Sequence, residues 1–84
     1  MNAENESIDL RIGEILHRVL NRDDLDLRSD DELLISGVLD SMAVIQLAME
    51  LEHEFEFQIP AMDITIENFE SITAMSDYVA GRLT

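Results

Sequence analysis

Ser41 is the residue of this chain whose type and position best suit chemistry. It follows Asp40 and stands at the start of the most regular amphipathic stretch of the sequence. Asp and Ser are enriched at helix N-termini, where a side-chain oxygen accepts a hydrogen bond from an otherwise unpaired backbone N–H. Three interpretations are open for Ser41: a helix-terminal residue with no further role, a catalytic nucleophile, or a site of covalent modification.

A nucleophilic serine needs a base within hydrogen-bonding reach. His53 lies 12 residues later on the same predicted helix, which places it about 18 Å away at the helical rise per residue. Nothing in the sequence places His17 near Ser41, and no G-x-S-x-G turn surrounds the serine. Two isolated histidines are also too few for a zinc site. The sequence therefore favours neither an enzyme nor a metal site.

A modified serine fits the end of a helix for electrostatic reasons. Free N–H groups and the helix dipole favour an anion there. A phosphodiester on Ser41 is stabilised by about 0.3–1 kcal/mol, and the adjoining carboxylate of Asp40 opposes it. The chain has no Cys, and all five of its basic residues are Arg. Disulfides, thiolate chemistry and Schiff-base lysines are thus excluded, and any thiol must come from an attached group.

Helical periodicity predicts the elements that position this serine. We expect helices over Ser7–Leu20 and Ser41–Phe55, one helical turn after Thr65, and a last helix from Ser71 to about Arg82. Ser7, Asp40, Thr65 and Ser71 are the predicted caps, and Pro60 is expected to limit the second helix. The predicted core positions are Ile8, Ile12, Ile15, Leu16 and Val19, then Val44, Leu47, Ala48, Leu51 and Phe55, then Ile66 and Phe69, and then Ile72, Met75, Val79 and Leu83.

The segment from Asn21 to Leu39 is long for a loop in a small domain, and such loops are often functional. It is rich in apolar residues, so we expect it to fold onto the bundle, with one helical turn near Asp31–Ile35. These residues are Leu25, Leu27, Leu33, Leu34, Ile35, Val38 and Leu39. The predicted fold is all-α: a small four-helix bundle of three main helices and one short helix. Residues 1–84 are expected to form a single domain, with 1–6 disordered.

Charge limits the partners. The chain has 5 basic and 19 acidic residues, for a net charge of −14. That charge opposes binding to nucleic acids and to anionic membranes and favours basic protein partners. No apolar stretch approaches the roughly 20 residues of a membrane-spanning helix, and the N-terminus lacks the features of a signal peptide. We therefore expect a cytoplasmic protein with no membrane insertion.

The wider pattern around Ser41 is more specific than the serine alone. The segment Leu33–Met42, LLISGVLDSM, resembles the prosthetic-group site of acyl carrier and peptidyl carrier proteins. Residues 52–60, EHEFEFQIP, are similar to the acidic end of that family's second helix and the turn after it, and residues 68–72, NFESI, to the junction of its last two helices. The resemblance covers nearly the whole chain from Ile8.

The resemblance implies that Ser41 carries covalent 4′-phosphopantetheine, transferred from coenzyme A by a phosphopantetheinyl transferase. It assigns Asp40 as the helix cap and as a recognition residue for the transferase. The arm ends in a thiol that holds acyl groups as thioesters, so the chain is expected to be a discrete, non-catalytic carrier and a monomer. The implied partners are an acyl- or aminoacyl-adenylate ligase, a synthase or an acyltransferase, each with a basic docking patch.

Two departures from the fatty-acid type of carrier bear on the cargo. Ala43 and Val44 stand where that type tends to have an acidic and a small polar residue, and the segment Asp63–Phe69 is longer than usual. Both features are more similar to carriers that work with adenylate-forming ligases, including aminoacyl and D-alanyl carriers. The cargo itself is left open.

The second helix also predicts a docking face. Met42 and Met49 fall outside its core arc, and Glu50 and Glu54 lie nearby. Exposed methionine beside carboxylates suits adaptable apolar contact combined with attraction to basic surfaces. We expect these four residues to bind partners. An alternative remains: an unmodified acidic helical adaptor that uses the same helix to bind basic proteins.

Overall fold

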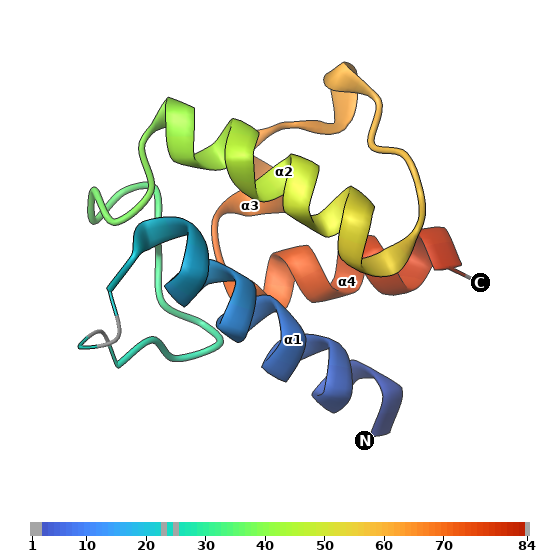
Figure 1. Cartoon of the computed structure of the whole chain (residues 1–84), viewed down its shortest axis with the longest axis horizontal. Coiled ribbons are helices and arrows are strands. Elements are labelled where there is room, and N and C mark those ends of the chain that lie inside the picture. Colours follow the sequence, from blue (N-terminus) through green and yellow to red (C-terminus); the bar gives the residue numbers. More distant parts are fainter. Residues whose placement is uncertain (1–2, 23, 25, 84) are drawn as a thin grey trace.

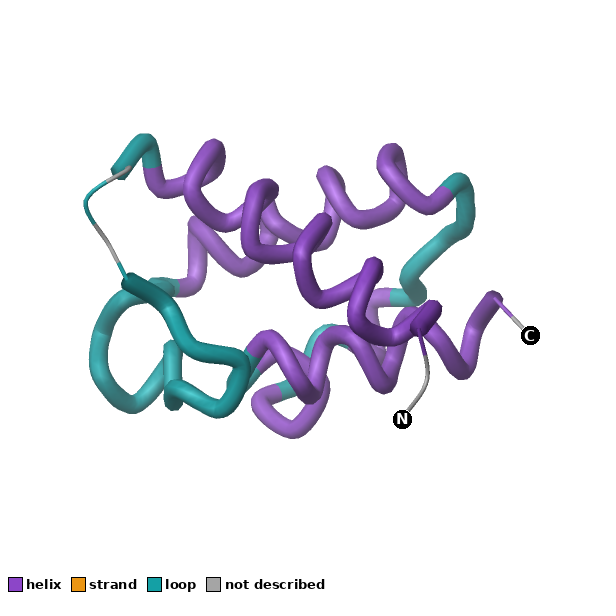
Figure 2. The backbone as a smooth tube through the Cα atoms, turned by 90° about the horizontal axis from the view of Figure 1, so that it is seen from below, coloured by secondary structure: helices purple, strands orange, loops and turns teal. Residues whose placement is uncertain are grey.

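The computed structural model describes residues 3–22, 24 and 26–83. Within them it contains four α-helices, one 3-10 turn and no strand. The elements in chain order are α1 (Ala3–Leu20), α2 (Ser41–Phe55), η1 (Ala61–Asp63), α3 (Ile66–Phe69) and α4 (Ile72–Leu83). α1 packs against both α2 and α4, and the long loop lies at the opposite end of the bundle from the first turn of α1 and the last turn of α4 (Figures 1 and 2). The predicted all-α four-helix bundle is confirmed.

α1 begins earlier than the sequence predicted. It starts at Ala3, so Ser7 lies inside the helix and the prediction that Ser7 caps it is wrong. Ala and Glu are strong helix formers, and they continue the helix backwards through residues 3–6. The prediction of disorder over 1–6 thus falls partly on helical residues and partly on Met1 and Asn2, which lie outside the described residues.

α2 begins at Ser41, as predicted, and its end has a local cause. Glu56 adopts the left-handed conformation (φ 54°), and its N–H donates to the carbonyl of Glu52. The helix therefore stops before Pro60, so Pro60 is not the residue that ends it. Thr65 and Ser71 are confirmed as capping residues, because their hydroxyls accept hydrogen bonds from the N–H groups of Asn68 (3.3 Å) and Ala74 (3.0 Å).

The long loop folds onto the helices, as its apolar content predicted. Leu33 is fully buried, and its N–H donates to the carbonyl of Glu70 at 2.8 Å. The N–H of Thr73 donates to the carbonyl of Ser29 at 2.9 Å, which joins the loop to the start of α4. The helical turn expected near residues 31–35 is present only as hydrogen-bonded turns over 33–37. Leu25 lies outside the described residues.

The core follows the predicted helical faces with a few differences. Val19 and Val44 are only partly buried and Leu83 is 48% exposed, whereas Ala43 and Ser76 are buried. Leu83 is exposed because the last turn of α4 lies at the edge of the bundle (Figure 1). The hydroxyl of Ser76 donates to the carboxylate of Asp9 in α1, which satisfies a polar group in the core. The buried apolar residues are Ile8, Ile12, Ile15, Leu16, Leu33, Leu39, Ala43, Leu47, Ala48, Leu51, Phe55, Ile59, Phe69, Ile72, Met75 and Val79.

Candidate functional site

Ser41 is the first residue of α2, and its neighbour Asp40 is the cap. Asp40 has extended backbone, and its Oδ1 accepts a hydrogen bond from the N–H of Ala43 at 2.8 Å. The Ser41 side chain is exposed, and within the described part of the chain no hydrogen bond engages its hydroxyl. The two residues thus divide the tasks at the helix terminus: the carboxylate satisfies the backbone, and the hydroxyl remains accessible.

The loop that leads to Ser41 holds it in a fixed position. Gly37 adopts a positive φ of 85°, a conformation that side-chain-bearing residues rarely adopt. Two residues later Leu39 is buried, and its N–H donates to the carbonyl of Leu33 at 3.0 Å. The chain is therefore anchored in the core immediately before Asp40, two residues from the exposed hydroxyl of Ser41.

A shallow apolar groove of about 370 Å³ lies beside Ser41. Its lining comes from the long loop, from α2, and from the segment that leads into α3. The hydroxyl of Thr65 in this lining is already used to cap α3, so the surface offered by the groove is mainly aliphatic. The lining residues are Leu34, Ser41, Val44, Ile45, Ile64, Thr65, Ile66 and Phe69.

Asp63 precedes the groove residue Ile64 and joins this segment to α3 and α4. Its carboxylate accepts a hydrogen bond from the hydroxyl of Tyr78 in α4 at 2.7 Å, and its carbonyl accepts one from the side-chain amide of Asn68 at 2.9 Å. Burial raises the pKa of Tyr78 to about 12, and the hydrogen bond to Asp63 and the charge of that carboxylate add to the effect. Tyr78 is therefore neutral and donating at neutral pH.

Comparison with known proteins agrees with this geometry. The family model described as the phosphopantetheine attachment site matches residues 11–79. The aminoacyl carrier protein 1 of Bradyrhizobium diazoefficiens is 33% identical over 99% of this chain and 93% of its own length. The D-alanyl carrier proteins of Leuconostoc mesenteroides and Streptococcus sanguinis are 33% and 34% identical, over 73% and 67% of this chain and 77% and 70% of their own lengths. The chain belongs to the phosphopantetheine-binding carrier protein family.

Family membership confirms the resemblance seen in the sequence and the predicted prosthetic group, 4′-phosphopantetheine. Members of this family carry groups and do not catalyse. The residues of this carrier fit the prosthetic group: Ser41 offers an exposed hydroxyl, and the N–H groups of Ser41 and Met42 have no partner among the described residues. Those N–H groups are suited to a phosphodiester.

The four predicted docking residues of the carrier lie on α2 in two different settings. Met42 and Met49 are 68% and 61% exposed and face outward. Glu50 and Glu54 lie at the edge toward α1, and each forms an ion pair across it, with Arg18 at 2.7 Å and with Arg11 at 2.8 Å. Neither ion pair was predicted, because sequence spacing does not show which side chains of two packed helices meet.

The structure also reveals exposed apolar residues that the sequence reasoning missed or placed in the core. Ile45 is 50% exposed between the two methionines of α2, and Ile66 is 67% exposed on α3 across the groove. Ile35 in the long loop and Met62 in η1 are exposed as well. Ile66 was predicted to lie in the core, and that prediction is wrong, because its side chain faces the open groove beside Ser41. The surface of the carrier around Ser41 is therefore more apolar than predicted.

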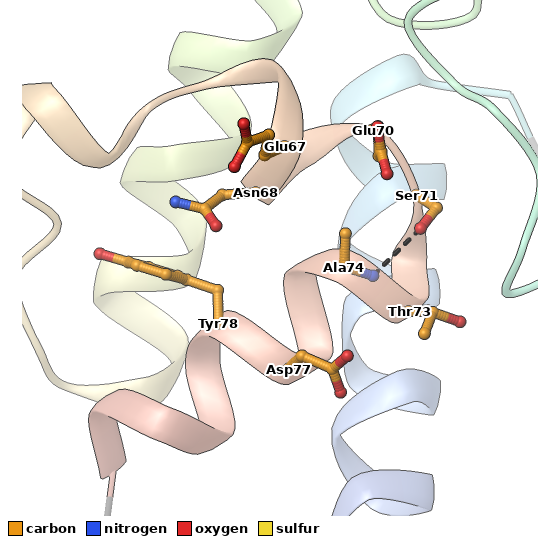
Figure 3. Close-up of a pocket in the computed structure, with 8 residues that line it drawn as sticks. All are labelled: Glu67, Asn68, Glu70, Ser71, Thr73, Ala74, Asp77 and Tyr78. Atoms are coloured by element: carbon orange, nitrogen blue, oxygen red, sulfur yellow. Dashed lines mark hydrogen bonds between the residues drawn. The ribbon is translucent and has the colours of Figure 1, made fainter.

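A second hollow, of about 540 Å³, lies over α3 and the first turns of α4 (Figure 3). It contains three carboxylates, those of Glu67, Glu70 and Asp77. The hydroxyl of Ser71 accepts a hydrogen bond from the N–H of Ala74 and so caps α4 (Figure 3). Ser41 does not line this hollow. It therefore adds to the acidic surface of the carrier without joining the site.

No helix among the described residues is long and apolar enough to cross a membrane. No three His, Asp or Glu side chains among them are grouped so as to hold a metal ion.

Proposed function

We propose that Ser41 is the attachment residue of this carrier, and that the carrier holds acyl or aminoacyl cargo as a thioester and presents it to partner enzymes. One observation carries the proposal: the exposed hydroxyl of Ser41, unbonded among the described residues, stands at the N-terminus of α2 inside the segment that matches the phosphopantetheine family. The described residues, in this proposal, make up a single carrier domain.

The chain's own groups have simple tasks in this function. Coenzyme A donates the phosphopantetheine, and the bisphosphorylated adenosine leaves as the Ser41 oxygen bonds to phosphorus. Asp40 keeps the helix terminus formed and, we propose, marks the site for the transferase. The free N–H groups of the first turn favour the phosphodiester charge. When bound, the group supplies the thiol that the chain itself lacks.

The cargo we propose is an aminoacyl group. The relatives are named as aminoacyl and D-alanyl carriers. Ala43 and Val44 after the attachment segment, and the long segment Asp63–Phe69, point the same way. The partners in this proposal are a phosphopantetheinyl transferase and an adenylate-forming ligase, followed by an acyl-transferring enzyme.

Docking, in this proposal, uses Met42, Met49, Glu50 and Glu54. The net charge of −14 attracts partners that carry a basic docking patch, while the methionines supply adaptable apolar contact. Coenzyme A is an intracellular metabolite, so we propose that the carrier works in the cytoplasm as a monomer.

Intact mass measurement tests the proposal. The chain is incubated with coenzyme A and a broad-specificity phosphopantetheinyl transferase, beside Ser41→Ala as the matched control. We expect the mass of the wild type to rise by one phosphopantetheine and that of Ser41→Ala to stay unchanged. An unchanged wild type that still binds basic proteins through α2 would instead make it an unmodified adaptor.

A second measurement tests the cargo. The chain that carries phosphopantetheine is incubated with ATP, a cognate ligase and a single amino acid or fatty acid. Its intact mass is then measured for a further increase. Loading by an amino acid supports an aminoacyl carrier, and loading by fatty acids alone contradicts it.

A further inference from the structure

The centre of the outward face of α2 carries no carboxylate, although the chain is strongly acidic. The exposed side chains along its centre are Met42, Ile45, Gln46, Met49 and His53. This face begins beside Ser41 and runs for three turns. The net charge of −14 therefore does not describe the local charge of this face, although Asp40, exposed beside Ser41, lies at its N-terminal end.

All three glutamates of α2 are engaged within the chain. Glu52 accepts a hydrogen bond from the N–H of Ile59 at 2.8 Å. Glu50 pairs with Arg18, and Glu54 pairs with Arg11. Two of the five arginines of the chain thus form ion pairs with the two glutamates at the α1 edge of this face.

The two ion pairs differ in how firmly they hold their carboxylates. Arg11 donates from Nε (3.0 Å) and Nη2 (2.8 Å) to one oxygen of Glu54 and also to its carbonyl (3.2 Å). Its guanidinium lies 4.3 Å from the centre of the Phe55 ring, a cation–π contact. Arg18 makes one hydrogen bond to Glu50, at 2.7 Å, and both side chains are more exposed. Glu54 is therefore held by several contacts with Arg11, whereas the negative charge of Glu50 is balanced through one hydrogen bond from Arg18.

The Arg18–Glu50 pair belongs to the same surface as the methionines. A shallow groove of about 340 Å³ between α1 and α2 is lined by Arg18, Val19, Gln46, Met49 and Glu50. A partner that covers Met49 must therefore also cover or adjoin the ion pair. The partner contacts there an ion pair with no net charge, beside the aliphatic side chain of Val19 and the thioether of Met49.

We propose that Arg18, by neutralising Glu50, is a specificity-determining residue for docking, and that the partner surface which fits this face is apolar and uncharged where it meets the α1 edge. Arg11 has the same effect on Glu54. This inference rests on the proposed function and changes one part of it: Glu50 and Glu54 lie in the contact as members of neutral ion pairs and do not pair with cations of the partner. The net charge attracts the partner at long range. The contact itself is made by apolar side chains, beside ion pairs in which arginine and glutamate balance each other's charge.

The proposal predicts how the dissociation constant changes in the two single variants and in the double variant of this ion pair. The dissociation constant is measured for the unmodified chain and a broad-specificity phosphopantetheinyl transferase without coenzyme A, so that no loading occurs. Arg18→Gln leaves Glu50 unpaired at an apolar contact, and Glu50→Gln leaves Arg18 unpaired. Each is expected to weaken binding about two- to fivefold, the scale of an exposed ion pair. The double variant is expected to bind within about twofold of the wild type.

Matched controls separate this effect from net charge. Arg82→Gln and Asp77→Asn, both on α4, make the same changes in net charge away from the face and are expected to change the dissociation constant less than about twofold. Met49→Ala is expected to weaken binding about tenfold if the contact is apolar. Circular dichroism verifies that each variant is folded.

The opposite pattern would overturn the inference. A partner that reaches Glu50 with its own cation would bind Arg18→Gln more tightly than Arg82→Gln. It would bind Glu50→Gln and the double variant with equally reduced affinity. Its binding to Arg18→Gln would also depend more steeply on salt concentration. Loading of Ser41 is measured separately. A chain that is loaded but shows this opposite pattern remains a carrier with a basic partner, whereas a chain that is not loaded fails the proposed function itself.

Discussion

The carboxylate of Asp40 caps α2 by accepting a hydrogen bond from the N–H of Ala43, and the hydroxyl of the adjoining Ser41 is thereby left out of the capping. Either side chain type is able to cap a helix, and only one of them is needed. Because the aspartate takes that role, modification of the exposed serine does not remove the cap. The pair links local folding to the proposed function.

This division of tasks predicts different costs for two neighbouring substitutions. Asp40→Ala removes the cap and is expected to lower the free energy of unfolding by about 0.5–2 kcal/mol. Ser41→Ala removes an exposed, unbonded hydroxyl and is expected to change it by less than about 0.5 kcal/mol. Urea unfolding followed by circular dichroism measures both. Equal losses for the two variants would show that Ser41 also caps the helix.

The long loop is predicted to contribute to stability as a core element does. Leu33→Ala is expected to lower the free energy of unfolding by about 2–5 kcal/mol, because Leu33 is fully buried. Ile35→Ala, two residues away, is the matched control: Ile35 is 78% exposed, and its truncation should cost less than about 0.5 kcal/mol. If both variants have the same free energy of unfolding as the wild type, the loop does not pack as described.

Tyr78 gives a prediction for alkaline pH. Its pKa is raised from 10.0 to about 12 in the folded chain by burial and by the bond to Asp63. The unfolded chain loses this proton at lower pH than the folded one, so stability is complete below about pH 10 and is lost as pH rises through the folded pKa. Tyr78 is the only tyrosine, so tyrosinate absorbance reports it directly.

The matched variant for this prediction is Tyr78→Phe. It keeps the ring that contacts Phe57 (centroids 6.3 Å apart) and removes the titrating group. Its free energy of unfolding is expected to be lower at neutral pH, and the tyrosine-dependent slope between pH 10 and 12 should vanish. A wild-type titration near pH 10, as for free tyrosine, would mean that the bond to Asp63 is not maintained in solution.

The two interhelical ion pairs are predicted to differ in strength. A double-mutant cycle on Arg18 and Glu50 is expected to give about 0.2–1 kcal/mol, the range for exposed pairs. The cycle on Arg11 and Glu54 should give the larger coupling, because Arg11 makes three hydrogen bonds to Glu54 and also contacts the Phe55 ring. Urea unfolding of the single and double variants measures both couplings. A larger coupling for Arg18 and Glu50 would reverse the order that the structure indicates.

Much of the fold could be predicted from local patterns. Caps such as Asp40, Thr65 and Ser71 act within three residues of themselves, so the sequence alone placed them correctly. The predicted start of α1 at Ser7 is wrong: Ser7 is a good capping residue, but helix formers precede it, and the helix begins at Ala3. Helical spacing predicted most of the buried positions, and the exceptions lie at the end of the bundle, as at Leu83, or beside the groove near Ser41, as at Val44 and Ile66.

The site was predictable to a different extent. The serine and its cap follow from adjacent residues, and the exposure of Met42 and Met49 follows from the helical wheel. The ion pairs of Glu50 and Glu54 join residues that are 32 and 43 positions from their partners. Such contacts depend on how α1 packs on α2, which no local pattern encodes. The pairing of Glu50 and Glu54 with arginines of α1 was therefore the feature of α2 that the sequence could not show.

The most direct test of the account locates the added mass along the chain. The chain is incubated with coenzyme A and the transferase, digested, and sequenced by tandem mass spectrometry, with Ser36→Ala and Ser41→Ala in parallel. We predict one phosphopantetheine on Ser41, present in Ser36→Ala and absent from Ser41→Ala. A phosphopantetheine found on another serine, or on the Ser41→Ala chain, would contradict the assignment.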